Sequence, residues 1–203
     1  ANGFNLDVNQ LIELIKTEKM DPTRVVGILP VHLFGHPCNM TQILDLSQQY
    51  KWFVLEDVAQ AFGTKWQRQT LGSLGTIGAF SFFPTKNLGG FGDGGLVTTD
   101  DNELAELVRM LLRHGGKDKY NVDHIGYNAR LDTLQAAVLL VRLKYVDQFN
   151  QKRRQVAEIY NQAFSTNTNI ITPQCCNICY DVSHQYTIRI KHGLRDQVQQ
   201  KLQ

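Results

Sequence analysis

A single lysine, Lys86, stands where an apolar run meets a glycine-rich loop. The segment FSFFPTKNLGGFGDGG, residues 80 to 95, places its amine directly after strand-forming residues. Asp57 follows the apolar run KWFVLED in the same way. Because the loops that follow parallel strands meet at one edge of an α/β sheet, we expect Asp57 and Lys86 to lie at the same edge. An acid and an amine placed this way can form either a salt bridge or a catalytic site.

Two further side chains favour the catalytic interpretation. Gln60 comes three residues after Asp57, so one turn can present a carboxylate and an amide to one ligand. Ser81 lies in the next predicted strand, and Pro84 ends that strand because it has no N–H to donate. This set of groups suits pyridoxal 5'-phosphate, with Asp57 on the ring nitrogen and Lys86 holding the aldehyde as a Schiff base.

The glycines after Lys86 offer a second phosphate-binding interpretation. Gly90, Gly92 and Gly95 fit the pattern G-x-G-x-x-G. The dinucleotide-binding fingerprint, however, follows a strand and opens a helix, whereas these glycines precede the apolar run LVTT. We therefore predict a turn that needs positive φ and close backbone approach, and that lets the chain fold around a ligand on Lys86.

Short apolar runs alternate with amphipathic runs along the chain, which is typical of an α/β protein with a largely parallel sheet. The apolar runs predict strands at residues 25–35, 51–57, 77–83 and 95–99. Asp7, and either Asp100 or Asp101, are expected to cap helices. The helical period from 131 to 164 predicts one long helix. We expect residues 1–145 to form part of a large domain, and 146–203 a linking helix and the start of a smaller one.

The composition argues against several classes of protein. The 203 residues are 42% hydrophobic and 20% charged, with a net charge of +2 and no basic stripe, so nucleic acid is not an expected partner. No apolar run approaches the ~20 residues that a membrane span needs. The first ten residues lack the pattern of a secretory signal. We expect a cytoplasmic protein that binds neither nucleic acid nor membrane.

The four cysteines are Cys38 and the three of CCNIC, namely Cys175, Cys176 and Cys179. A Cys-x-x-Cys spacing can bind zinc or exchange thiols. A structural zinc site needs four ligands, and only His184 lies near enough in sequence to add one. We expect reduced thiols in a loop and no metal site.

Five motifs occur in a fixed order from about Arg24 to the C-terminus: VHLFG, EDVAQAFG, FSFFPTKNLGGFGDGG, GYNARLDTLQAA and QKRRQVAEIYN. Together they resemble the DegT/DnrJ/EryC1/StrS family of pyridoxal phosphate-dependent aminotransferases, which act on nucleotide-linked keto sugars. The resemblance implies a fold-type I α/β protein with a mixed, mostly parallel sheet flanked by helices. It also implies that the N- and C-terminal parts of the family fold are absent, because full-length members are longer.

The resemblance also assigns roles to single residues. Lys86 would be the Schiff-base lysine and the general acid/base, and Asp57 the partner of the ring nitrogen. Gln60 would lie beside the phenolic oxygen, and Ser81 would bind the phosphate. Asn128, in GYNARL, would reach the cofactor phosphate of the neighbouring subunit, which implies a homodimer with shared active sites.

A lysine at position 86 favours transamination, because related sugar dehydratases carry histidine there. The family's usual amino donor is glutamate. The glycine loop most resembles that of members that aminate C3 of a dTDP-3-keto-6-deoxyhexose. Two other hypotheses stay open: a catalytically idle paralogue that acts as a binding or regulatory module, or a fragment without activity of its own.

Three other residues receive simpler interpretations. His32, at a strand exit, could line the pocket, although a packed and hydrogen-bonded histidine fits its position better. Arg153 and Arg154 are expected on the exposed side of a helix.

Overall fold

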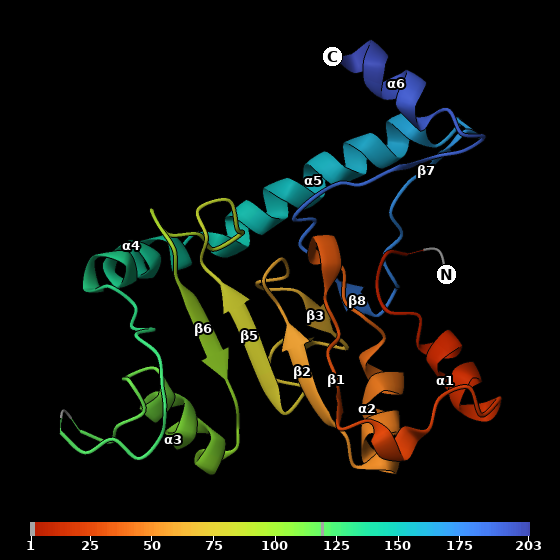
Figure 1. Ribbon diagram of the computed structural model, residues 1–203. Coiled ribbons are helices and arrows are strands. Elements are labelled where there is room, and N and C mark those ends of the chain that lie inside the picture. The colour runs from red at the N-terminus through yellow and green to blue at the C-terminus, as the bar shows by residue number, and fades with distance from the viewer. Residues whose placement is uncertain (1–2, 119) are drawn as a thin grey trace.

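The computed structural model describes residues 3–118 and 120–203. Its main sheet has the order β1-β2-β5-β6 (Figure 1). These strands are β1 (Gly27–Ile28), β2 (Phe53–Asp57), β5 (Ile77–Ser81) and β6 (Gly95–Thr98). The first three run parallel, and β6 pairs antiparallel with β5. The expected mixed, mostly parallel α/β architecture is confirmed.

The first strand is much shorter than the run 25–35 predicted. After β1 only an isolated bridge between Val31 and Asp57 continues the pairing. Pro30 has no N–H to extend the ladder, and the chain then turns through the short 3-10 helix Leu33–Gly35, in which Phe34 has a φ of 60°. The turn carries the chain away from the sheet edge.

Six helices surround the sheets in the described part of the chain. They are α1 (Val8–Lys16), α2 (Met40–Tyr50), α3 (Asn102–Leu111), α4 (Thr133–Leu143), α5 (Val146–Phe164) and α6 (Arg195–Leu202). Asp7 caps α1 and Asp101 caps α3, each accepting hydrogen bonds from two backbone N–H groups of the first turn. Both expected caps are therefore confirmed.

The single helix expected from 131 to 164 is in fact two. α4 ends at Leu143 and α5 begins at Val146. The break lets Leu139 of α4 and Val146 of α5 bury their side chains in one cluster with Phe82 and Leu88. A helical period cannot reveal such a break, because both helices remain amphipathic.

Two small sheets attach the C-terminal segments. β3 (Lys65–Trp66) pairs with both β4 (Gln69–Thr70) and β8 (Cys179–Tyr180). β7 (Ile170–Ile171) pairs with β9 (Arg189–Ile190). The pairing of β8 with β3 joins the region after α5 to the first half of the chain, and the division into domains at residue 145 remains a prediction.

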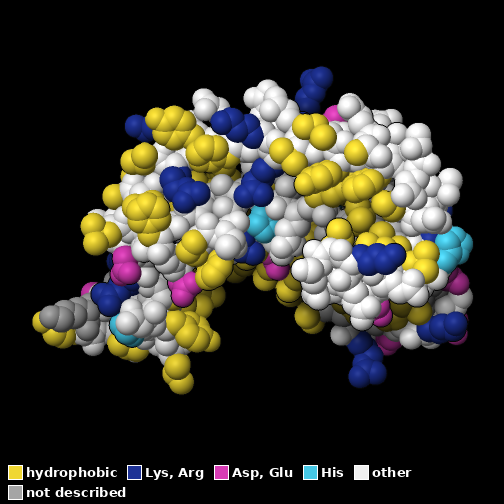
Figure 2. All heavy atoms as spheres, turned by 90° about the horizontal axis from the view of Figure 1, so that it is seen from above, with side chains coloured by type: hydrophobic (Ala, Val, Ile, Leu, Met, Phe, Trp, Pro, Cys, Tyr) yellow, Lys and Arg dark blue, Asp and Glu magenta, His cyan; other side chains and the backbone are white. Residues whose placement is uncertain are grey.

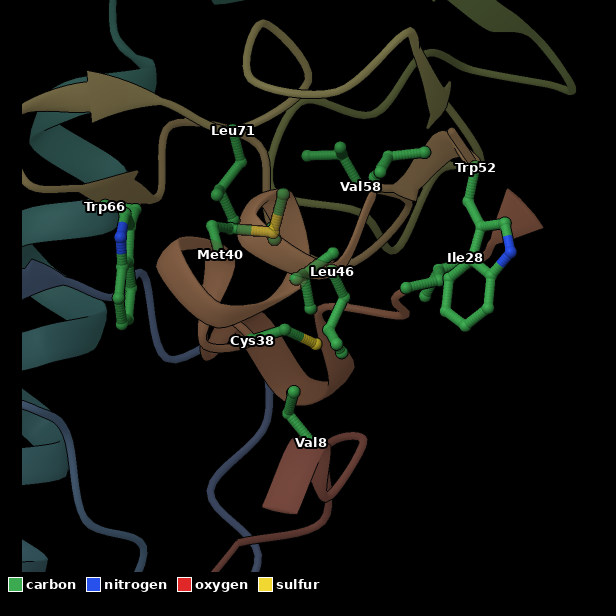
Figure 3. Packing of buried hydrophobic residues seen from close by; sticks show 12 residues of the cluster. Val8, Ile28, Cys38, Met40, Leu46, Trp52, Val58, Trp66 and Leu71 are labelled. Carbon is green, nitrogen blue, oxygen red and sulfur yellow. The ribbon is translucent and has the colours of Figure 1, made fainter. Parts of the chain in front are cut away.

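Helix α2 packs on one face of the main sheet. Figure 3 shows the cluster between them, in which Met40 and Leu46 of α2 lie near Val58 and Leu71. The opposite face is less covered: Phe53 is 46% exposed there. Because β2 alternates, Asp57 lies on the same face as Phe53. Figure 2, seen from above, shows a deep notch between two lobes of the molecule, with hydrophobic side chains beside it.

The cysteine cluster differs from the expectation of reduced thiols. Cys176 and Cys179 form a disulfide, and Cys38 and Cys175 are free. The turn before β8 brings the two Cα atoms to 5.3 Å, a separation that a disulfide can bridge. Residues 3–118 and 120–203 contain no group of three His, Cys, Asp or Glu side chains that could hold a metal ion. None of the helices described is long and apolar enough to cross a bilayer.

Candidate active site

Asp57 and Ser81 close two neighbouring parallel strands, β2 and β5. The register pairs Asp57 with Ala79, so Ser81 lies two residues further toward the carboxyl edge. The Phe83 N–H donates a hydrogen bond to the Ser81 hydroxyl at 3.3 Å instead of to a neighbouring strand. The strand therefore ends at Ser81, two residues before the predicted end at residue 83. Lys86 follows in a turn whose backbone N–H donates to the Phe83 carbonyl at 2.9 Å. The structure therefore places Asp57, Ser81 and the turn that carries Lys86 at one edge of the sheet.

Asp57 is held rigidly. Its backbone N–H donates to the Pro30 carbonyl at 2.9 Å, and its carbonyl accepts from His32 N–H at 3.1 Å. Its Oδ1 accepts from Ala59 N–H at 2.9 Å. Among the residues that the structure describes, no ion pair joins Asp57 to Lys86. In this part of the chain, Asp57 and Lys86 therefore do not form the simple salt bridge.

Gln60 has its amide orientation fixed by the turn after β1. Its Oε1 accepts from Phe34 N–H at 2.7 Å. The Gln60 NH₂ group therefore remains the end that can donate to a ligand. The same bond supports the unusual positive φ of Phe34.

Glu56 is a buried carboxylate that the sequence reasoning missed. It is 0% exposed and accepts four hydrogen bonds, one from His32 Nε2 at 3.3 Å and three from backbone N–H groups at 2.7 to 2.9 Å. The backbone donors are Gly72, Leu74 and Gly75. Burial is the largest influence and opposes ionisation, but the four hydrogen bonds together hold the pKa of Glu56 below its ordinary value. The only sequence signal was an acid at an inward position of the β2 alternation.

His32 is the packed, hydrogen-bonded histidine that its position favoured. It is 0% exposed. Its Nδ1 accepts from Cys38 N–H at 3.1 Å, so the ring hydrogen is on Nε2 and points to Glu56. His32 therefore supports Glu56 and does not line the pocket.

The residue after Lys86 is also part of a buried network. Asn87, 4% exposed, bonds to His184 Nδ1 at 2.7 Å and to Asn150 Oδ1 at 2.6 Å. Burial, together with the positive charges of Lys86 and Arg153, lowers the pKa of His184 to about 4. No sequence signal could have found this group, because the residues bonded to Asn87 lie 63 and 97 positions away from it.

The glycine loop is only partly as predicted. None of its glycines has a positive φ, so that part of the prediction is wrong. Close approach does explain them: a Cβ on Gly89 would lie 2.6 Å from the Pro84 carbonyl oxygen, and one on Gly90 would lie 2.7 Å from Gln135 Oε1. The same Gln135 oxygen accepts from Phe91 N–H at 2.8 Å. The groups that approach these glycines thus belong to the protein itself, from its own loop and from α4.

The expectation that Arg153 and Arg154 lie on the exposed side of a helix is confirmed for Arg154 and wrong for Arg153. Arg153 is half-buried, and its Nη1 donates to the His184 carbonyl at 3.1 Å. Arg154 is exposed, and its guanidinium lies 4.1 Å from the Tyr180 ring centroid and 3.7 Å from Asp181. The C-terminal segment covers this side of α5, a contact between distant segments that the helical period does not encode.

Among the described residues, Asn128 forms no hydrogen bond or bridge with the other four predicted site residues. It is exposed and forms an isolated bridge with Arg113, just after α3. Its Oδ1 accepts from Arg130 Nε at 3.2 Å. Within this chain, the structure does not bring Asn128 to Lys86.

The remaining groups fit pyridoxal phosphate. Asp57 offers a fixed carboxylate, Gln60 a fixed NH₂ donor and Ser81 a hydroxyl at a strand end. Lys86 is half-buried, and no ion pair engages its amine in the described part of the chain. These are the types of group that the ring nitrogen, phenolic oxygen, phosphate and aldehyde each require.

Comparisons with known proteins agree with the family resemblance. The model of the DegT/DnrJ/EryC1/StrS aminotransferase family matches residues 1–203. The chain is 41% identical over 198 residues to a pleiotropic regulatory protein of Geobacillus stearothermophilus, covering 97% of this chain and 51% of that protein. It is 38% identical over 191 residues to the dTDP-3-amino-3,4,6-trideoxy-alpha-D-glucose transaminase of Streptomyces venezuelae, covering 94% of this chain and 50% of that protein.

A solved structure supports the fold as well. NtdA of Bacillus subtilis, with bound cofactor PMP, superposes with a TM-score of 0.85 at 32% identity, over 98% of this chain and 44% of that one. The chain spans about half the length of the curated relatives it matches. It belongs to the DegT/DnrJ/EryC1/StrS aminotransferase family, whose members have this α/β fold and use pyridoxal phosphate.

Proposed function

We propose that the protein transfers an amino group from an amino acid, with glutamate as donor, to a nucleotide-linked keto sugar. The observation that carries this proposal is Lys86, half-buried at the carboxyl edge of the sheet and free of ion pairs among the described residues, with the rigid Asp57 at the same edge. The S. venezuelae relative, named as a sugar transaminase, supports the reaction class.

Each residue would have a distinct task. When bound, pyridoxal phosphate supplies an electron sink for the substrate carbon. Asp57 would keep the ring nitrogen protonated, Gln60 would donate to the phenolic oxygen, and Ser81 would hold the phosphate. The Nζ of Lys86 would move a proton between the substrate carbon and the imine carbon of the cofactor, a role that requires a neutral amine.

For the acceptor, we propose C3 of a dTDP-3-keto-6-deoxyhexose. The support is the resemblance of the glycine loop and the name of the S. venezuelae relative, a dTDP-3-amino-3,4,6-trideoxy-alpha-D-glucose transaminase. A homodimer with shared active sites is also proposed, because the family resemblance assigns Asn128 to the neighbouring subunit's cofactor and its contacts within one chain are with Arg113 and Arg130.

Borohydride trapping tests the proposal. Pyridoxal phosphate is added, the protein is reduced, and the modified lysine is identified by peptide mass analysis. The adduct should form on Lys86, and the absorbance of the lysine-bound cofactor should vanish in Lys86→Ala. Lys144→Ala, at the exposed end of α4, is the matched control and should keep both signals. Retained absorbance in Lys86→Ala would contradict the proposal.

The name of the G. stearothermophilus relative favours one alternative, a binding or regulatory module. A half-reaction with glutamate distinguishes an aminotransferase from a regulatory module. An aminotransferase converts the bound cofactor to its pyridoxamine form and releases 2-oxoglutarate, whereas a regulatory module binds the cofactor and leaves glutamate unchanged.

A further inference from the structure

A chain of buried hydrogen bonds leads from the residue after Lys86 to helix α5 and beyond. Asn87 Oδ1 lies 2.7 Å from His184 Nδ1, and Asn87 Nδ2 donates to Asn150 Oδ1 at 2.6 Å. Asn150 Nδ2 then donates to the carbonyl oxygen of Phe62 at 3.1 Å. Asn87, Asn150 and His184 are 4%, 1% and 9% exposed, so water does not compete for these bonds.

The backbone carbonyl of Phe62 sets the direction of every bond in this chain. A carbonyl oxygen can only accept, so Asn150 must face Phe62 with its nitrogen and Asn87 with its oxygen. Asn87 must then turn its own oxygen toward His184. Because that oxygen also only accepts, His184 carries a hydrogen on Nδ1, and the neutral ring has Nε2 as its acceptor.

The surroundings of His184 favour its uncharged form. Burial is the largest influence, and two cations face the ring: Lys86 from the loop after β5 and Arg153 from α5. These hold the pKa of His184 at about 4, so the imidazole is neutral near pH 7. The direction of the hydrogen bonds, and not charge, therefore decides which ring nitrogen accepts.

We propose that Asn87 and Asn150 are positioning residues of the Lys86 site. Anchored on the Phe62 carbonyl, they hold the backbone next to Lys86 and keep His184 in the Nδ1–H form. This inference rests on the proposed function and deepens it, since Lys86 is the residue being positioned. An imidazole in this form can accept a hydrogen bond at Nε2 from a cationic amine, whereas the other neutral tautomer would present a donor there.

Nitrogen-15 NMR of the imidazole, in the cofactor-free protein, measures the tautomer directly. The wild type should show the Nδ1–H form. Asn150→Ala removes the anchor, so the Asn87 amide can turn over and the Nε2–H form of His184 should appear. Asn161→Ala is the matched control. Asn161 also lies on α5 and accepts a hydrogen bond from the Tyr186 hydroxyl at 2.7 Å, but it is not part of the hydrogen-bond network of Asn87, Asn150 and His184. It should leave the tautomer unchanged.

A second variant keeps the test decisive if Asn150→Ala does not fold. Asn87→Asp places a carboxylate against the Nδ1–H group and should raise the pKa of His184 by about one unit or more. An Nε2–H form in the wild type would overturn the proposal. So would an unchanged tautomer in folded Asn150→Ala, or an unchanged pKa of His184 in Asn87→Asp.

The effect on Lys86 itself is read by trapping. In Asn150→Ala, the share of borohydride-trapped pyridoxal phosphate on Lys86, relative to other lysines, should fall about threefold or more, and in Asn161→Ala it should not. An unchanged share in a folded Asn150→Ala would overturn the positioning of Lys86. Absence of any Lys86 adduct in the wild type would instead contradict the proposed function, which the tautomer measurements do not depend on.

Discussion

At the scale of single residues, Glu56 carries a buried charge one position before Asp57. Its four hydrogen bonds outweigh the burial that opposes ionisation, so the pKa of Glu56 lies below its ordinary value. A carboxyl group whose folded pKa is lowered stabilises the fold above its unfolded pKa of about 4.3. That stabilisation is lost as the pH falls through the folded pKa.

Glu56→Gln should therefore lower the free energy of unfolding at neutral pH by roughly 2–4 kcal/mol, because an amide leaves at least one buried N–H group unpaired. Urea denaturation measures this, and the difference from the wild type should shrink as the pH falls below about 4.3 and through the lower folded pKa of Glu56. Glu106→Gln is the control, since Glu106 and its partner Arg109 are both exposed. A Glu56→Gln protein as stable as the wild type would contradict the assigned role.

At the scale of elements, the loop between β5 and β6 folds back on itself to place Lys86. Gly89 packs against the backbone of its own loop. A Cβ at this position would lie 2.6 Å from the Pro84 carbonyl oxygen. A Cβ on Gly92 would instead lie 3.0 Å from Gln135 Nε2, the end of a side chain that can move. The same substitution should therefore have different effects at these two positions.

Gly89→Ala should displace the turn that carries Lys86, and should reduce the rate of Lys86 trapping by pyridoxal phosphate about tenfold. Its thermal unfolding midpoint should also fall. Gly92→Ala should keep the trapping rate of the wild type. If both variants trap equally fast, close packing at Gly89 does not position the lysine.

At the scale of the whole molecule, the proposed homodimer would bring Asn128 of one subunit to Lys86 of the other. Lys86→Ala should be inactive and Asn128→Ala strongly impaired. In an equal mixture that exchanges subunits, half of the dimers are hybrids, and each hybrid keeps one complete site. About a quarter of wild-type aminotransferase activity should then return.

Light scattering confirms that the mixture is dimeric, and a mixture of Lys86→Ala with Asp57→Ala is the control. Both of those residues serve the site of their own subunit. Each site of a hybrid dimer would therefore lack either Lys86 or Asp57, and no activity should return. Absence of recovery in the Lys86→Ala and Asn128→Ala mixture would show that Asn128 acts in its own subunit or not at all.

Much of the fold follows from local signals. A cap depends on a few neighbouring N–H groups, so Asp7 and Asp101 could be recognised from short segments. The alternation of apolar and amphipathic runs was enough to predict the α/β class. Asp57, Ser81 and Lys86 could be placed together because strand ends share an edge in any parallel sheet.

The sequence by itself therefore determined the class of fold, the caps and the residues at the carboxyl edge, since each depends on neighbours or on a general rule of sheets. Only the tertiary structure decided the contacts between segments far apart in the chain. It divided the predicted helix at Tyr145 so that both halves could pack in one cluster. It joined Asn87 to Asn150 and His184, 63 and 97 positions away. Such partners are selected by packing and hydrogen-bond satisfaction in three dimensions, which no short pattern of residues contains.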